Sequence, residues 1–125
     1  MRPVLLALIL ATCLPTVGLA ADDDPAETAC RQKESDNDIA GCLQRLTGQW
    51  DKRLNAAYQT TLKASDDEAQ KSALLRAERA WLAFRTANCD WYGTHQGTIR
   101  TVYAANCMLD MTRGRAVELE QALKP

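Results

Sequence analysis

A loop between two helical segments holds the residues of this chain best suited to contact another molecule. It contains the only histidine of the sequence, His95, with Trp91 and Tyr92 before it and Arg100 after it. A catalytic triad would need a nucleophile and an orienting acid beside this histidine, and nothing in the sequence brings them together. Exposed aromatic rings near an arginine are typical of protein contacts. We therefore predict a partner-binding edge made of Trp91, Tyr92, His95 and Arg100.

Other patterns of catalytic or cofactor chemistry are missing from the sequence. Asp66, Asp67 and Glu68 form an acidic cluster, but at a helix start these acids are better explained as caps than as the paired carboxylates of a glycoside hydrolase. Glu78 lies on a helix with arginines, which favours structural ion pairing. There is no phosphate-binding loop, no HExxH motif and no dinucleotide fingerprint. The sequence therefore predicts a protein without catalysis, metal or cofactor.

The N-terminus has the features of a secretory signal over residues 1–20. Arg2 supplies a positive start, residues 4–11 form an apolar run too short to cross a bilayer, and cleavage is expected after Ala20. The alternative is a lipid anchor on Cys13, although the threonine just before that cysteine argues against it. Either form of processing places the protein in the periplasm or outside the cell.

The composition of residues 21–125 excludes several classes of function. Removing the signal takes away one of the 15 basic residues and none of the 16 acidic ones, which leaves a net charge of about −2. No basic run is present, so the chain is not expected to bind nucleic acid. No second apolar stretch is long enough to cross a membrane. The remaining length suits a single domain.

Four of the five cysteines remain after the signal: Cys30, Cys42, Cys89 and Cys107. An even number in a small exported domain indicates disulfides and allows three connectivities. The spacings lack the short CxxC pairs that zinc sites favour, so a four-cysteine zinc site is the weaker alternative. Proximity favours pairing Cys30 with Cys42 and Cys89 with Cys107, because each pair closes a short loop.

The chain organisation begins with residues 21–35, which are acidic, contain Pro25 and are expected to form a flexible leader. A helical domain is expected over residues 36–125. Its first helix should begin near residues 36–38, where short polar side chains cap free amides. Apolar residues recur along this helix at steps of three and four, which indicates an amphipathic helix: Ile39, Leu43, Leu46, Trp50, Leu54, Tyr58 and Leu62.

A turn over residues 64–67, with a capping box that begins at Ser65, separates this helix from a second one. The second helix carries a broad apolar stripe that suits a central position between two neighbours: Leu74, Ala77, Trp81, Phe84, Asn88 and Trp91. Trp81 is accordingly expected in the core. Arg85 flanks the stripe, so we expect it to be structural and to pair with a carboxylate or with helix C-terminal carbonyls.

A third helix follows the break at residues 93–97. Its apolar stripe also alternates steps of three and four: Val102, Ala105, Leu109, Thr112, Ala116, Leu119 and Leu123. Cys107 lies almost opposite this stripe, which conflicts with a bond to Cys89 if the helix is buried on one face only. Together these elements predict an all-α fold, a small antiparallel three-helix domain stapled by two disulfides.

From residue 30 to about residue 120, the chain resembles the LprI-type lysozyme-inhibitor-like family of bacterial exported proteins. The resemblance rests on Cys42 and on three spaced motifs: Leu54-x-x-x-Tyr58-x-x-x-Leu62, Ala77-x-Arg79-Ala80-Trp81-x-x-Phe84-Arg85-x-x-x-Cys89, and Cys107-x-x-x-x-Thr112-x-x-Arg115-x-x-x-Leu119. It implies an all-helical, disulfide-bonded envelope protein without catalysis and, for some members, inhibition of lysozyme. Members often have a Gly-Gly pair before the third helix, where this chain has Gln96-Gly97.

Two functions are consistent with these features. The first is a non-enzymatic binding protein that blocks lysozyme or a related cell-wall hydrolase, with His95 and Arg100 opposite the catalytic carboxylates and the aromatic rings in a sugar subsite. Vertebrate-type lysozymes are strongly basic, so an acidic partner would associate faster through electrostatic steering. The alternative is an immunity-like or stress-related envelope protein that binds another toxin or enzyme.

Overall fold

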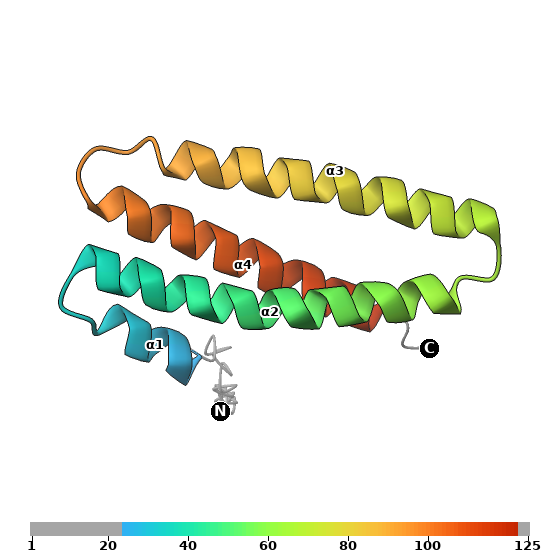
Figure 1. Cartoon of the computed structure of the whole chain (residues 1–125), viewed down its shortest axis with the longest axis horizontal. Coiled ribbons are helices and arrows are strands. Elements are labelled where there is room, and N and C mark those ends of the chain that lie inside the picture. The colour runs from blue at the N-terminus through green and yellow to red at the C-terminus, as the bar shows by residue number, and fades with distance from the viewer. Residues whose placement is uncertain (1–23, 123–125) are drawn as a thin grey trace, which may run out of the picture.

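Four helices make up the part of the chain that the computed structural model describes, residues 24–122 (Figure 1). They are α1 (Pro25–Arg31), α2 (Asp36–Ala64), α3 (Glu68–Tyr92) and α4 (Ile99–Gln121). The all-α prediction is confirmed, and the count of three helices is wrong because of α1. The expected signal, the Cys13 anchor and the last residue of the third stripe, Leu123, lie outside the described residues.

The short helix α1 occupies residues 25–31 of the leader that was expected to be flexible before residue 36. Its start is capped by Asp24, whose side chain accepts a hydrogen bond from the Ala26 amide at 2.9 Å. Pro25 occupies the first turn, where its missing N–H costs no hydrogen bond. The helix buries Cys30, which is 1% exposed and forms a disulfide with Cys42 of α2. The acidic residue and the proline that suggested a flexible leader therefore form the start of a helix, and the Cys30–Cys42 disulfide attaches this helix to α2.

An ion pair and a hydrogen bond hold α1 against α4. The Glu27 carboxylate accepts hydrogen bonds from Arg31 at 2.6 Å and from Arg113 of α4 at 2.9 Å. Arg31 also donates to the Asn106 side chain of α4 at 3.3 Å. Burial alone would raise the pKa of Glu27, but the two arginines outweigh it and lower this pKa below its ordinary value.

We expect a Glu27→Gln variant to lose part of the acid sensitivity of the fold. A lowered carboxyl pKa contributes stability above the unfolded-state pKa, and this stability disappears as the pH falls through the folded-state value. Below about pH 4.5 the unfolding free energy of the wild type should therefore fall by about 1 kcal/mol or less more than that of the variant. Melting temperatures of both proteins between pH 7 and pH 3 check this. Parallel curves would contradict it.

The main apolar core lies between α2 and α4, which run in the same direction while α3 runs opposite to both (Figure 1). Helix α2 begins as expected, with the Ser35 hydroxyl accepting a hydrogen bond from the Asp38 amide at 3.1 Å. Leu43 of α2 and Leu109 of α4 are 0% and 1% exposed. All the described members of the third predicted stripe are buried: Val102, Ala105, Leu109, Thr112, Ala116 and Leu119.

The turn between α2 and α3 is where it was predicted, but the residue that caps α3 lies two positions after the predicted start of the capping box. Asp67, not Ser65, caps α3, because its carboxylate accepts from the Gln70 amide at 2.7 Å. The Gln70 side chain reaches back to the Asp66 amide at 3.2 Å. Ser65 instead donates to the Thr61 carbonyl at 3.0 Å and ends α2.

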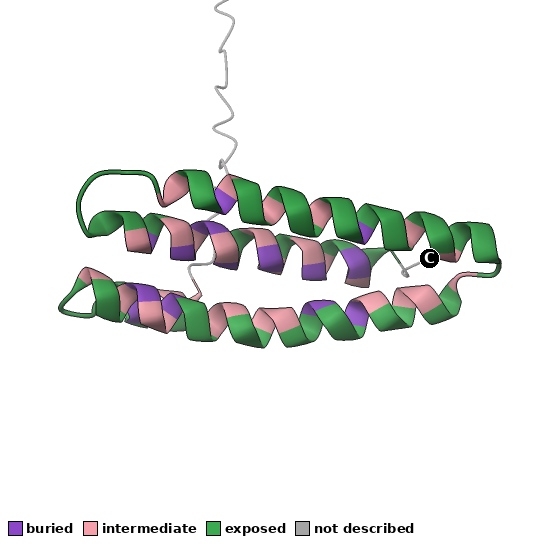
Figure 2. Ribbon diagram, turned by 45° about the horizontal axis from the view of Figure 1, so that its top comes forward, coloured by how far each residue is buried: buried purple, intermediate pink, exposed green. Residues whose placement is uncertain are grey.

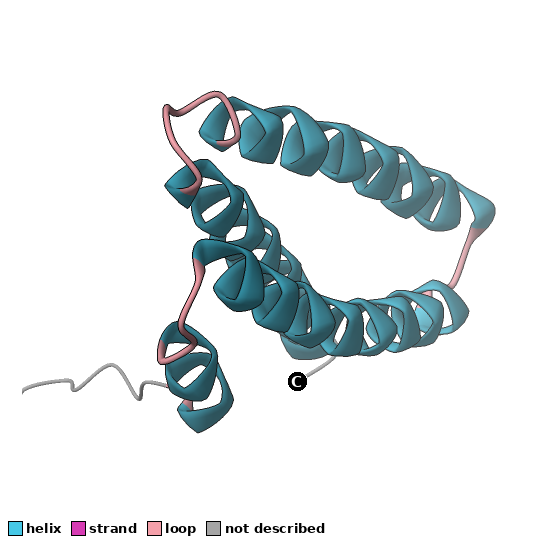
Figure 3. Cartoon of the chain, turned by 60° about the vertical axis from the view of Figure 1, so that its left-hand side comes forward, coloured by secondary structure: helices cyan, strands magenta, loops and turns pink. Residues whose placement is uncertain are grey.

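Helix α4, not α3, occupies the central position. It packs along α2 on one face and carries α3 on another (Figure 3). The conflict over Cys107 therefore disappears, because this residue points to the α3 face while the apolar stripe faces α2. Burial is accordingly concentrated on α2 and α4, and most of α3 is exposed (Figure 2).

The core assignment on α3 is wrong. Ala77 is exposed, Phe84 is 59% exposed, and Trp81 is half-buried beneath two arginines instead of packed in an apolar core. The physical reason is that α3 has one principal neighbour, α4, and meets it through polar side chains.

Candidate partner-binding site

The loop between α3 and α4 begins with a C-cap and ends with a glycine that its backbone requires. The Gly93 amide donates to the Cys89 carbonyl at 3.2 Å and closes α3. Gly97 has a φ of 77°, a conformation that favours glycine. Among the described residues no other has positive φ, so Gln96 fits where the family often has a first glycine.

Aromatic rings gather at this loop. The ring of Trp91 meets those of Tyr92 and His95 edge-on at 4.8 and 5.7 Å between centroids. His95 lies nearly parallel to Tyr92 at 6.2 Å and edge-on to Tyr103 of α4 at 5.3 Å. The structure therefore brings three of the four predicted site residues into one cluster and adds Tyr103, which was not predicted as a site residue.

This cluster presents its rings to solvent. Trp91 is 58% exposed and Tyr103 is 42% exposed, and His95 is exposed as well. Large exposed rings held against one another need little reorganisation to contact a partner. The signal for Tyr103 was present in the sequence, because Tyr103 lies one helical turn before Cys107 on the face that meets α3.

The imidazole of His95 has a fixed orientation. Its Nδ1 lies 2.9 Å from the Tyr92 carbonyl oxygen. A carbonyl only accepts, so Nδ1 carries the proton in this contact. The other ring nitrogen, Nε2, is then the acceptor in the neutral form and becomes a donor when the ring is protonated.

Arg100 is exposed in the first turn of α4. The N-cap residue of that helix, Thr98, makes no side-chain capping bond and instead donates its hydroxyl proton to Asp36. The Asp36 carboxylate therefore already lies near the positive end of this helix, and Arg100 adds an exposed positive charge in the first turn. Arg100 is the predicted site residue that could pair with a carboxylate of a partner.

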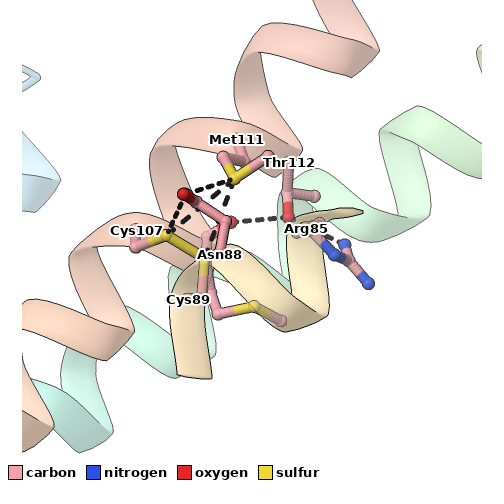
Figure 4. Close-up of a disulfide and its surroundings, with 7 residues drawn as sticks. Arg85, Asn88, Cys89, Cys107, Met111 and Thr112 are labelled. Atoms are coloured by element: carbon pink, nitrogen blue, oxygen red, sulfur yellow. Dashed lines mark hydrogen bonds between the residues drawn. A yellow bond between two sulfur atoms is a disulfide. The ribbon is translucent and has the colours of Figure 1, made fainter. Parts of the chain in front are cut away.

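A disulfide with a small polar cluster supports the base of the loop (Figure 4). Cys89 of α3 is bonded to Cys107 of α4, and Cys89 is 2% exposed. The Asn88 amide nitrogen lies 3.3 Å from the Cys107 sulfur and 3.4 Å from the Met111 sulfur. The loop is therefore anchored at both ends to the central helix, and a shallow groove runs beside it between α3 and α4, lined by Asn88, Tyr92, Tyr103, Asn106, Asp110 and Met111.

Behind the loop, α3 and α4 meet through charged side chains. Arg115 pairs with Glu78 at 3.0 Å, and their side chains are only 10% and 9% exposed. This confirms structural pairing for Glu78, and it explains why Arg115 belongs to the spaced motif. We name Glu78, Trp81, Arg85, Thr112 and Arg115 the polar seam.

Arg85 behaves as expected of a structural arginine. Its Nη1 donates to the Thr112 hydroxyl at 2.9 Å (Figure 4) and lies 3.5 Å from the Asp51 carboxylate of α2. The Arg85 guanidinium also lies 4.9 Å from the Trp81 ring centroid, which is a cation–π distance. The side chain is 13% exposed, so it links all three long helices from a nearly buried position.

The described residues supply no sign of a metal centre or a membrane span. Within residues 24–122 no group of histidine, cysteine and carboxylate side chains is placed to hold a metal ion. In the same part of the chain no helix is long and apolar enough to cross a bilayer. What the site offers is aromatic and cationic surface.

These features describe a small all-helical domain with two disulfides and an anchored aromatic loop. The family model described as "Lysozyme inhibitor LprI" matches residues 27–119. The chain therefore belongs to the LprI lysozyme inhibitor family. An uncharacterised protein from Rhizobium meliloti (strain 1021) is 26% identical over 138 aligned positions, covering 99% of this chain and 97% of that protein. No solved structure is significantly similar to the chain.

Proposed function

We propose that this protein inhibits lysozyme by binding it through the α3–α4 loop, without turning over a substrate. The observation that carries the proposal is the cluster of exposed rings on a loop anchored by the Cys89–Cys107 disulfide. Membership of an inhibitor family supports a protein partner. The two disulfides and the family are consistent with a site of action outside the cytoplasm.

The chemistry of the loop complements a glycosidase cleft. Such a cleft holds sugar rings and two carboxyl groups that act on the glycosidic bond. Trp91 and Tyr92 would fill a sugar subsite with apolar ring faces, while Arg100 and His95 would meet the carboxyl groups. Occupation of the cleft excludes the cell-wall substrate, which is sufficient for inhibition.

Restraint of the loop contributes to affinity. A segment already fixed by a disulfide, a C-cap and stacked rings loses little conformational entropy when it docks. The acidic residues Asp66, Asp67 and Glu68 lie at the start of α3, at the end of the helix away from the loop (Figure 1), so they do not belong to the docking edge. Any steering toward a basic enzyme comes from the net charge of the whole protein.

We expect a His95→Ala, Arg100→Ala double variant to inhibit lysozyme at least about tenfold less well than the wild type. Truncating contact residues at the centre of an interface costs about 2 kcal/mol or more, and 1.4 kcal/mol is a factor of ten. Both residues are exposed, so the melting temperature should change little. Inhibition curves against a bacterial cell-wall suspension measure the effect.

The matched control is a Lys52→Ala, Gln59→Ala double variant, which truncates two exposed side chains of α2 away from the loop. It should inhibit like the wild type. Full inhibition by the loop variant would refute the loop assignment. Equal weakening by both variants would show that the contact surface extends elsewhere and would refute it as well.

A further inference from the structure

Helix α3 carries an apolar strip that the described fold leaves uncovered. Its members alternate steps of four and three, the spacing of a heptad seam, and all six are exposed. We name them the outer strip: Ala73, Ala77, Ala80, Phe84, Ala87 and Trp91. The strip spans about 27 Å along the helix. Phe84 and Trp91 are 59% and 58% exposed, so most of their ring surface has no cover within the described part of the chain.

The outer strip is separate from the face that α3 presents to α4. That inner face carries Glu78, Arg85 and Cys89, which make the ion pair, the hydrogen bond and the disulfide to α4. At 3.6 residues per turn, the strip lies on one flank of this inner face. A straight apolar seam on a solvent-exposed helix is the pattern of a helix that packs against another helix.

We propose that a second copy of this chain covers the outer strip, with the two α3 helices packed antiparallel about a two-fold axis. In this register Trp91 of one copy lies opposite Ala73 of the other, Phe84 lies opposite Ala80, and Ala77 lies opposite Ala87. Each ring then meets a small side chain, and every contact occurs twice by symmetry. A parallel arrangement would instead place ring against ring and alanine against alanine, which packs less evenly.

Charge complementarity supports the same arrangement. Arg76 and Asp90 each lie one residue before a strip position, Ala77 and Trp91, and therefore on the same edge of the strip. Antiparallel pairing brings Arg76 of one copy beside Asp90 of the other, twice per dimer. Both side chains belong to exposed residues, and within residues 24–122 neither is in an ion pair; Arg76 donates to the Ser72 hydroxyl at 2.8 Å.

The experiment is sedimentation of the purified, disulfide-bonded protein over a range of concentrations. We expect the average mass to rise from that of a monomer to that of a dimer as the concentration passes through the micromolar range. Phe84→Asp should raise the dimer dissociation constant at least about tenfold, because it places a charge in the outer strip. Leu82→Asp is the matched control: Leu82 is 40% exposed but lies on the other flank of α3, so the dimer should persist.

Charge reversal tests the antiparallel register. Arg76→Glu alone and Asp90→Arg alone should each weaken the dimer, and the combined variant should restore it, because the pairs reform with opposite signs. A wild type that stays monomeric throughout overturns the proposal. So does a dimer that Phe84→Asp leaves intact, or a combined variant that is not restored. The dimer covers Trp91, which the proposed function places in the lysozyme contact, so a dimer and a lysozyme complex exclude each other at this residue. The masses are measured without lysozyme and the variants leave Trp91 unchanged, so failure here is distinct from failure of the proposed inhibition.

Discussion

An Arg115→Met variant should lose about 3–5 kcal/mol of unfolding free energy, because it removes one partner of a buried ion pair. Glu78 would be left with its carboxylate 9% exposed and without its arginine. Among the described residues Arg115 supplies the hydrogen bond to Glu78 Oε2, and Glu78 Oε1 has no partner. Chemical denaturation monitored by circular dichroism measures the loss.

The companion variant Glu78→Leu, Arg115→Met should recover most of this loss. Well-packed apolar residues often replace a buried ion pair without destabilisation, and here Glu78 Oε1 and Arg85 Nε are already buried without partners in the described chain. Arg53→Met is the control, because the Arg53–Glu120 pair is exposed and should matter little. If the single and double variants are equally unstable, the Glu78–Arg115 ion pair is not what stabilises the polar seam.

Removing the Cys89–Cys107 bridge by Cys89→Ser, Cys107→Ser should lower stability by about 3 kcal/mol and loosen the end of α3 that lies next to the loop. Helix α3 has a mainly polar contact with α4 and much less contact with α2, so the disulfide is its principal tie near the loop. Hydrogen exchange in the last turns of α3 should therefore accelerate while exchange in α2 and α4 stays slow. Inhibition of lysozyme should weaken with it, because the loop loses its base.

Removing the other bridge, Cys30–Cys42, is the matched control. It closes a short connection between α1 and α2 and leaves α3 attached. Hydrogen exchange in α3 should then match the wild type. Fast exchange in α3 after removal of Cys30–Cys42, or unchanged exchange there after removal of Cys89–Cys107, would contradict the separate roles assigned to the two disulfides.

The long helices were predictable from sequence because their apolar periodicity and polar caps are local signals. The buried positions of α4 follow the predicted stripe from Val102 to Leu119, and Ser35 caps α2 where short polar residues were expected. Helix α1 was missed because its few apolar residues give no periodic signal, and its order depends on the distant partners Cys42 and Arg113.

The stripe on α3 misled because periodicity does not say which surface will cover a helix face. Phe84 has helical spacing from Trp81, yet it is exposed, while Trp81 packs beneath Arg85 and Arg115. The Glu78–Arg115 pair joins residues on different helices, and no local pattern could identify it. In the candidate site, the aromatic residues of the loop could be read from the sequence. The contact between Tyr103 and His95 could not, because it depends on how the loop folds back onto α4.

The central claim is that this protein inhibits lysozyme by direct binding, and a titration of a fixed amount of enzyme with the purified, disulfide-bonded protein tests it most directly. The rate of cell-wall lysis should fall in proportion to added protein and reach its minimum near one binding site per enzyme molecule. Undiminished lysis in the presence of a large molar excess would contradict the account and would favour a different toxin or enzyme as the partner.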